Sequence, residues 1–436
     1  MGDIINIYSD IPVNWSVSKL KYFSSIYTGN SLNDAEKNKF SNDEDGLEGR
    51  IYISSKDINV HNNSCNYDTD IIIPYNETKY KLAPLGSSLL CIEGGSAGKK
   101  LTFTKQEVCF VNKLACFTGE DSESSKFIYY YLQSDGFKVQ FNSSLSGLIG
   151  GVSLTNLNDF QVPIPQKQTQ IRIAEFLDKK TAEIDAIIEK KENLLLLLEE
   201  KKKAIINEAV TKGINPNAPM KDSGIEWIGE IPEHWEVKPL GYLGSCQNGV
   251  SKGGDYFGEG HPFVNYGDIY KNYELPTTVE GLAKSSEEDR EAYSVLYGDV
   301  FFTRTSETIE EIGIASTCLK TIENAVFSGF TIRFRPYSLE ELYPEYSKYF
   351  FRSNYIRVSL VKEMNLVTRA SLSQTLLKSL KVILPPYEEQ KSIVLYFQNK
   401  FQTIDKAKEK IDVQINKLKE YRQSLISEAV TGKIDI

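Results

Sequence analysis

The stretch EGGSAGKK, which begins at Glu93, has the residue types of a loop that binds phosphate. In such loops glycines let backbone N–H groups approach phosphate oxygens, and a lysine followed by serine or threonine completes the site. Here Glu93 stands where the first glycine is required, and Lys100 stands where the magnesium-binding Ser or Thr belongs. These departures argue against a nucleotide site, but they leave a small-residue loop followed by two lysines.

The stretch LPPYEEQ, which begins at Leu384, resembles the (Asn/Asp)-Pro-Pro-Tyr loop of enzymes that methylate amino groups of DNA bases. That loop starts with an amide or carboxylate because its oxygen accepts hydrogen bonds from the target amino group. Leu384 cannot accept them, and no Gly-rich cofactor loop follows a strand elsewhere. The simpler interpretation is a strand end followed by a helix start, with Glu388 and Glu389 in the first helical turn.

Histidine and cysteine show no spacing that would bind a metal or build a catalytic triad. The three His are scattered, and the six Cys include no Cys-x-x-Cys pair and no nearby His. This argues against a zinc module and against a dense disulfide framework. We therefore expect no metal site, free thiols and a non-catalytic protein.

The chain contains an internal repeat with a constant offset of 220 residues. IPVNWSVSKL from Ile11 matches IPEHWEVKPL from Ile231, and EAVT from Glu208 matches EAVT from Glu428. The whole stretch 162–214 aligns with 382–434 without a gap. Since repeats fix architecture, the chain is predicted to be a tandem duplication of one structural unit.

Each repeat holds a region of mixed pattern, roughly 21–160 and 241–380. Short β-branched and aromatic runs such as GRIYISSKDINV, SSLLCIE, GDVFFTR and FTIRFRP predict strands. The stretches SSKFIYYYLQSDGFKVQ and EYSKYFFRSNYIRVSL predict short helices. Each region is therefore predicted to form a compact α/β domain.

A long segment with coiled-coil spacing follows each mixed region. Apolar residues recur every seven positions, interrupted only by Lys191. These heptad residues are Leu177, Ile184, Leu198 and Ile205 in the first segment and Phe397, Ile404, Ile411, Leu418 and Leu425 in the second. They predict two helices of about 65 Å that contact each other or a partner. The alternative is two amphipathic helices buried separately in globular cores.

These features predict an α/β protein with two globular domains and two long antiparallel coiled-coil helices, related by a pseudo-two-fold tandem duplication. The predicted division is a first domain at 1–165, a first helix at 166–212, a linker at 213–230, a second domain at 231–385 and a second helix at 386–431.

The repeated motifs resemble those of the DNA-specificity subunits of type I restriction-modification systems. SGIEWIGEIPEHWEVKPL from Ser223 resembles the family's entry motif, and PPYEEQKSIVLYF and EYRQSLISEAVTGKI resemble the start and end of its long helices. The first copy departs from the pattern, because IPVNW lacks the SGIEWIGE lead-in and Gln168 and Thr169 replace the usual acidic pair. The resemblance covers essentially the whole chain.

The resemblance implies two target-recognition domains, each entering a major groove, that read a two-part target across a non-specific spacer set by helix length. It implies double-stranded DNA and two methyltransferase (modification) subunits as partners. Restriction/translocase subunits complete the implied complex. S-adenosylmethionine, ATP and magnesium would be held by those partners, and this chain would hold no cofactor.

The net charge of −9 is unusual for a chain that binds DNA, because phosphate binding requires basic surfaces. Residues 21–160 hold 13 basic and 17 acidic residues, and residues 241–380 hold 14 and 18. We therefore expect basic residues to gather on one face and partner subunits to supply much of the phosphate contact. Nanomolar specific binding by the isolated chain at physiological salt would contradict this expectation.

The candidate DNA-binding residues lie beside Gly-rich loops and strand ends. They are Lys56, Lys99, Lys100, Tyr266, Arg304, Thr305, Ser306 and Arg369. For each, an ordinary solvated or core role is the alternative. Arginine is the side chain that most often binds guanine, through two hydrogen bonds. Residues 241–380 hold seven arginines, whereas residues 21–160 hold only Arg50. The second half-site is therefore expected to be richer in guanine. Trp15 and Trp235 are expected to anchor domain to helix.

Three other functions remain open: a coiled-coil assembly adaptor that reads no DNA, an autonomous DNA methyltransferase, and an acidic DNA mimic. The last does not predict the repeat. The N-terminal sequence MGDIINIYSD lacks the regions of a signal peptide, and the longest apolar run, Leu194 to Leu198, is too short to cross a bilayer. We therefore expect a cytoplasmic protein with no membrane partner.

Overall fold

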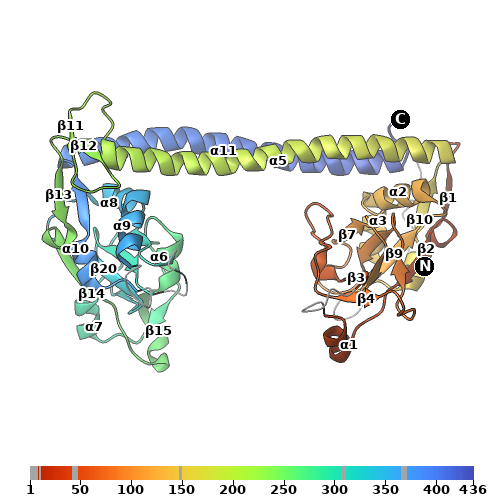
Figure 1. The fold of residues 1–436 in the computed structure, drawn as a ribbon, viewed down its shortest axis with the longest axis horizontal. Coiled ribbons are helices and arrows are strands. Elements are labelled where there is room, and N and C mark those ends of the chain that lie inside the picture. Colours follow the sequence, from red (N-terminus) through yellow and green to blue (C-terminus); the bar gives the residue numbers. More distant parts are fainter. Residues whose placement is uncertain are drawn as a thin grey trace. The chain divides into compact units, whose positions relative to one another are not determined.

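A computed structural model describes residues 8, 11–41, 48–146, 150–305, 308, 311–364 and 371–436. The chain forms two compact units, one of Met1–Glu192 with Asp412–Ile436 and the other of Asn193–Ile411. Each unit consists of an α/β domain together with segments of both long helices, α5 (Lys167–Lys212) and α11 (Tyr387–Val430) (Figure 1). The boundaries of the two compact units therefore differ from the predicted division along the sequence, because each long helix contributes residues to both units.

The domain of the first unit is built on two four-stranded sheets. One runs in the order β2 (Ser25–Thr28), β9 (Leu114–Thr118), β6 (Ser88–Cys91) and β7 (Leu101–Phe103). The other runs β4 (Ile72–Pro74), β3 (Gly49–Ile53), β8 (Val108–Phe110) and β5 (Leu82–Ala83), with β3 and β8 parallel. A separate pair joins β1 (Ser16–Lys19) to β10 (Gln161–Ile164). The helices are α1 (Asp34–Lys39), α2 (Ser122–Tyr131), α3 (Asp135–Ser143) and α4 (Leu154–Asp159).

The second unit repeats this plan. Its four-stranded sheet runs β14 (Gly244–Asn248), β20 (Thr331–Pro336), β17 (Val300–Thr303) and β18 (Ala315–Thr317). A three-stranded sheet runs β16 (Leu282–Ala283), β15 (Phe257–Val264) and β19 (Val326–Phe327), and β13 (Glu236–Pro239) pairs with β21 (Lys381–Leu384). The helices are α6 (Tyr266–Lys271), α7 (Glu287–Ala292), α8 (Pro344–Phe350), α9 (Asn354–Met364) and α10 (Gln374–Ser379). A hairpin of β11 (Met220–Asp222) and β12 (Glu230–Pro232) occupies most of the predicted linker.

The predicted elements and the tandem duplication are confirmed. The four predicted strands are β3, β6, β17 and β20, and the two predicted helical stretches contain α2 with α3 and α8 with α9. The strand in GRIYISSKDINV ends at Ile53 because Ser54 and Asp57 form a capping box that starts a 3-10 turn. The LPPYEEQ stretch is the end of β21 and the start of α11, as the simpler interpretation expected.

The two long helices run antiparallel in each unit. In the first unit Arg422 Nε donates to Asp185 Oδ1 at 2.9 Å, and Lys191 Nζ donates to Gln414 Oε1 at 2.7 Å. In the second unit Lys202 pairs with Asp405, and Lys408 pairs with Glu199. A higher number on one helix always meets a lower number on the other, which is the register of an antiparallel pair.

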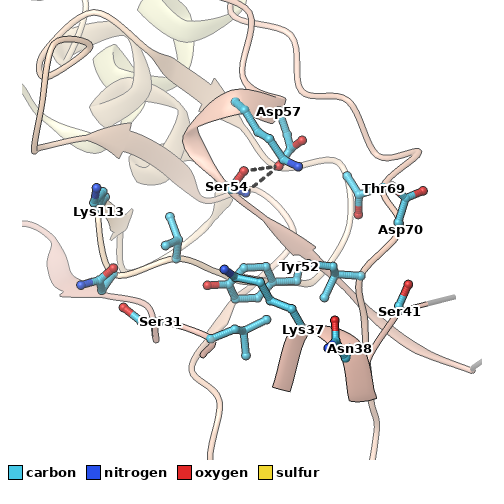
Figure 2. Close-up of a pocket in the computed structure, with 15 residues that line it drawn as sticks. Ser31, Lys37, Asn38, Ser41, Tyr52, Ser54, Asp57, Thr69, Asp70 and Lys113 are labelled. Carbon is cyan, nitrogen blue, oxygen red and sulfur yellow. Dashed lines mark hydrogen bonds between the residues drawn. The ribbon is translucent and has the colours of Figure 1, made fainter. Parts of the chain in front are cut away.

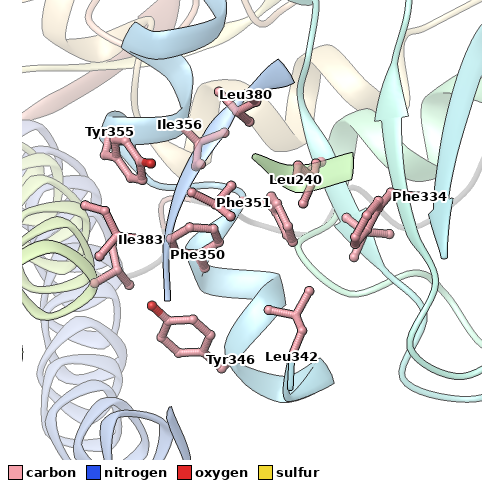
Figure 3. Close-up of a cluster of buried hydrophobic side chains, with 14 of the residues drawn as sticks. Leu240, Phe334, Leu342, Tyr346, Phe350, Phe351, Tyr355, Ile356, Leu380 and Ile383 are labelled. Atoms are coloured by element: carbon pink, nitrogen blue, oxygen red, sulfur yellow. The ribbon is translucent and has the colours of Figure 1, made fainter. Parts of the chain in front are cut away.

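Most heptad residues lie inside the units. Leu177, Ile184, Phe397, Ile404, Ile411 and Leu425 are buried, while Leu198, Ile205 and Leu418 are half-buried. In the second unit Phe397 belongs to the same apolar cluster as Val210 of α5 and Phe350 of α8. Figure 3 shows the part of this cluster around Tyr346, Phe350 and Phe351. The long helices are therefore both paired with each other and packed into a domain core, which combines the two predicted alternatives.

A tryptophan of each entry motif lies against the end of a long helix. A Cβ placed on Gly213, after α5, would lie 3.3 Å from Trp235, and one placed on Gly432, after α11, would lie 3.1 Å from Trp15. Both glycines have positive φ, near +75° and +71°, which ends a helix at little steric cost. Trp235 is fully buried and donates from Nε1 to Glu389 Oε2 at 3.0 Å. The expected anchoring of domain to helix is confirmed.

Replacing Trp235 with Ala is predicted to destabilise the second unit by about 3–5 kcal/mol, because it leaves a cavity and removes a hydrogen bond to Glu389. Hydrogen exchange of second-unit amides in increasing urea measures the change. Tyr242→Ala is the control, since that ring is 77% exposed in the same domain. Equal exchange in the two variants would contradict the anchoring role.

Candidate nucleic-acid interface

In the first domain a tight loop leaves the end of β6 and carries the Gly-rich motif. Gly98 N donates to Cys91 O at 2.8 Å, and Ala97 N donates to Gly94 O at 2.9 Å. Gly98 has φ near +73°, and a Cβ there would lie 2.8 Å from the Phe141 ring, so a larger residue would not fit. The loop therefore presents Lys99 and Lys100 at a fixed place beside the sheet.

Lys56, Lys99 and Lys100 are brought together around this loop. Lys100 Nζ donates to Ser55 O at 2.6 Å, and Ser55 is the neighbour of Lys56 in the 3-10 turn. Lys99 Nζ donates to Gly95 O at 3.3 Å. Lys56 and Lys99 are exposed, and Lys100 is half-buried. Lys100 thus ties the turn to the loop, while the other two lysines face solvent.

A pocket of about 710 Å³ adjoins the same turn (Figure 2). Its wall includes Lys56, Asn38, Asn112 and Lys113, and the Tyr52 ring lies at its centre. The pocket is adjacent to the Gly-rich loop because Ile92 N, at the start of the loop, donates to Lys113 O at 3.0 Å. Asp57 and Asp70 line the pocket as well, so its lysine and asparagine side chains are the groups that can donate to the acceptor-rich edges and phosphates of a nucleic acid.

The second domain has an equivalent loop after β17. Gly313 N donates to Thr303 O at 2.8 Å, and Gly313 has φ near +72°, matching Gly98. Arg304 Nη1 donates to Gly329 O at 3.4 Å, and Thr305 forms a bridge with Ser371. Arg304 and Thr305 are half-buried. The other two candidates in this domain, Ser306 and Arg369, lie outside the described residues.

Tyr266 joins this loop from the start of α6. Its hydroxyl donates to Glu311 O at 3.2 Å. The helix start is fixed by a capping box in which Asn265 accepts from Asp268 N and Asp268 accepts from Asn265 N. Burial raises the pKa of the Asp268 carboxyl, although the hydrogen bond from Asn265 N opposes the shift. Tyr266 therefore contacts the second-domain loop through its hydroxyl. In the first domain, Ser55 contacts the Gly-rich loop through its carbonyl, which accepts from Lys100.

The candidate residues that the structure describes thus form two clusters, one in each domain. Three residues that the sequence analysis did not single out join them: Asn112 and Lys113 in the first domain and Phe330 in the second. Their turns, FVNK and FSGF, share only the phenylalanine that precedes them. Nothing in this pattern separates them from other turns, and only the hydrogen bonds between strands place them beside the loops.

The first cluster places exposed positive charge around one loop of an acidic domain. Lys56, Lys99 and Lys113 are exposed around one loop. Arg50, the domain's single arginine, is bound to Glu107 at 2.5 Å and lies over the Tyr75 ring. The exposed basic side chains of this cluster are therefore lysines, and the arginine is held by a carboxylate.

The described residues contain no group of three or more His, Cys, Asp or Glu placed to hold a metal ion. Across the same residues, no helix combines the length and apolar character that crossing a membrane requires.

Thr303→Val is predicted to loosen the second-domain loop. Thr303 Oγ1 donates to Glu311 O at 2.6 Å and accepts from Ile314 N at 2.9 Å, so valine would leave Ile314 N unpaired and remove one of the hydrogen bonds to Glu311 O, at a cost of about 1–3 kcal/mol. Hydrogen exchange of residues 304–314 measures the loss. Ser316→Ala is the control, because the buried Ser316 hydroxyl has no partner among the described residues. Unchanged exchange in Thr303→Val would refute the role.

Comparison with known proteins places the chain in a family. The model of the "Type I restriction modification DNA specificity domain" matches twice, at residues 12–197 and 232–417. The EcoKI specificity subunit of Escherichia coli K12 is 24% identical over 86% of this chain and 81% of its own length, and the StySPI specificity subunit of Salmonella potsdam is 22% identical over the same shares.

Solved structures show the same fold. A chain from a type I R-M system, studied for its complex assembly and conformational transition, has a TM-score of 0.70 and 16% identity over 98% of this chain and 100% of its own. The HsdS subunit from Thermoanaerobacter tengcongensis has a TM-score of 0.52 and 15% identity over 98% of both. Since the family model covers both repeats at their offset of 220 residues, the chain belongs to the family of type I restriction-modification DNA specificity subunits, with two target-recognition domains.

Proposed function

We propose that this chain directs a type I methyltransferase to an asymmetric, two-part DNA sequence, with one half read by each target-recognition domain. The observation that carries this proposal is the pair of equivalent loops, closed by Gly98 and Gly313, on a repeated framework. The framework is the same, but the side chains around the loops differ: Asn112 and Lys113 in one domain, Tyr266 and Arg304 in the other. Two different readers on one framework fit two different half-sites.

Partners supply the chemistry in this proposal. Two modification subunits hold S-adenosylmethionine and methylate adenine, and restriction/translocase subunits add ATP- and magnesium-dependent steps in the cytoplasm. Exposed leucines on α5 support docking of a partner helix or loop, because Leu196 is 64% and Leu197 is 59% exposed. The partners also complete the phosphate contacts that the acidic domains cannot make alone.

Deleting the gene is predicted to abolish adenine methylation at one bipartite motif in the source cell. The expected motif has two short specified parts and a fixed unspecified gap, because the chain is the component that selects the site. Genome-wide detection of methylated adenine measures this, and restoring the gene should restore the motif. Persistence of every methylated motif would contradict the proposal and favour an assembly adaptor that reads no DNA.

Lys56→Gln combined with Lys99→Gln is predicted to weaken DNA binding by the assembled methyltransferase without changing its recognition sequence. Removing one lysine–phosphate pair lowers the slope of log K against log salt by about one, so the double variant should lower it by about two. Titration of duplex DNA at several salt concentrations measures the slope. Lys105→Gln, exposed in the turn between β7 and β8, is the matched control. An unchanged slope would show that neither lysine binds phosphate.

A further inference from the structure

Two turns occupy the same place in the two domains. In the first, Asn30 N donates to Phe110 O at 2.9 Å, and in the second, Val250 N donates to Phe327 O at 2.8 Å. A glycine precedes each donor, at positions 29 and 249, and a Cβ on either would lie within 2.3 Å of the phenylalanine carbonyl oxygen. Both glycines are required by this close approach, and they are separated by the repeat offset of 220.

The residue three positions after each phenylalanine contacts the start of the loop that follows β6 in the first domain and β17 in the second, in the same way. Ile92 N donates to Lys113 O at 3.0 Å, and Arg304 N donates to Phe330 O at 2.9 Å. Lys113 and Phe330 are therefore structural equivalents, although one side chain is cationic and the other is apolar. Both side chains are exposed beside the start of the loop.

The backbone around Phe330 is fixed, while its ring lies in solvent. Gly329 N donates to Val250 O at 2.8 Å, Phe330 N donates to Ser328 Oγ at 3.2 Å, and Thr331 N donates to Ser328 O at 3.0 Å. The Phe330 side chain is nevertheless 67% exposed. A rigid turn that presents a bare ring contributes nothing to the core. The same turn holds a cation, since the Arg304 guanidinium donates to the carbonyl of Gly329, the residue before Phe330.

We propose that this shared position determines base preference in each half-site: Phe330 contacts the methyl group of a thymine in the second half, and Lys113 donates to a purine acceptor in the first. Phenylalanine is one of the side chains that contacts the thymine methyl in the major groove, and lysine binds guanine O6 and N7 there. Arg304 beside Phe330 supplies a donor to the neighbouring base or phosphate. This inference rests on the proposed function and deepens it.

The test uses the methyltransferase assembled from this chain and its modification subunits, acting on a library of random duplexes. Phe330→Ala should reduce the preference for thymine at one position of the second half-site by about fourfold, the equivalent of one methyl-sized apolar contact. The first half-site should be unchanged. Tyr337→Ala is the control, because Tyr337 is 71% exposed in the same domain but lies at the end of β20.

Exchanging the two side chains gives the reciprocal result. Phe330→Lys should change the base selected in the second half only, and Lys113→Phe should change the base selected in the first half only. Phe330→Leu, which keeps an apolar side chain, should retain most of the thymine preference.

Three results would overturn the inference. The first is that neither Phe330→Ala nor Phe330→Lys alters the base preference in the second half-site. The second is an equal loss of selectivity in both half-sites, and the third is that Tyr337→Ala reduces the thymine preference as much as Phe330→Ala does. These results leave a bipartite wild-type motif standing, and with it the proposed function. A wild-type complex that methylates no bipartite motif would instead refute the proposed function together with the inference.

Discussion

Each α/β domain packs against both long helices, and this packing is the constraint on which the rest of the structure depends. In the second unit, Val210 comes from the helix of the first repeat and Phe397 from the helix of the second, and both are fully buried in one cluster. In the first unit, Gln423 of α11 donates to Gln133 O at 2.8 Å, and Asp178 of α5 accepts from the Tyr130 hydroxyl at 2.6 Å. The hydrophobic effect therefore joins the two repeats in the second unit, and in the first unit side-chain hydrogen bonds connect the domain to both helices.

The same constraint explains which parts of the repeat resemble each other in sequence. The paired glutamines Gln170 and Gln390 are both buried, and each donates from Nε2 to the proline carbonyl five residues earlier, at 3.0 and 2.9 Å. A buried amide that loses its partner costs free energy, which restricts the residue at these positions. The loops that begin near Ile92 and Arg304 carry no such restriction, since their side chains project from a backbone already closed by Gly98 and Gly313. A fixed frame with free loops is the arrangement that lets one fold carry different recognition surfaces.

Charge is divided in a similar way. The first domain is acidic in sum, yet Lys56, Lys99 and Lys113 stand exposed around one loop, while Arg50 is held by Glu107. Because short-range contact with phosphate depends on local rather than total charge, a net charge of −9 is compatible with a nucleic-acid interface. The second domain commits several of its arginines internally: Arg335 is paired with Asp299 at 2.6 Å, and Arg352 donates to the carbonyls of Ile269 and Asn272 at the C-terminal end of α6. The large arginine count of that domain therefore overstates how many remain for DNA, and among the described residues Arg304 lies beside the loop.

The sequence by itself determined the duplication, the α/β character of both domains, the two long helices and the family. These depend on short-range patterns: a 220-residue offset, β-branched runs, seven-residue spacing and the motifs around Trp235 and Pro385. It also placed Lys56, Lys99, Lys100, Tyr266 and Arg304 near the loops, because those residues adjoin glycines and strand ends. Only the tertiary structure decided that the core of the second domain takes residues from both helices, that Lys100 binds a carbonyl, and that Lys113 and Phe330 are equivalent. The physical reason is that these relations are made by hydrogen bonds and packing between strands and helices far apart in the chain, which leave no periodic signal in the sequence.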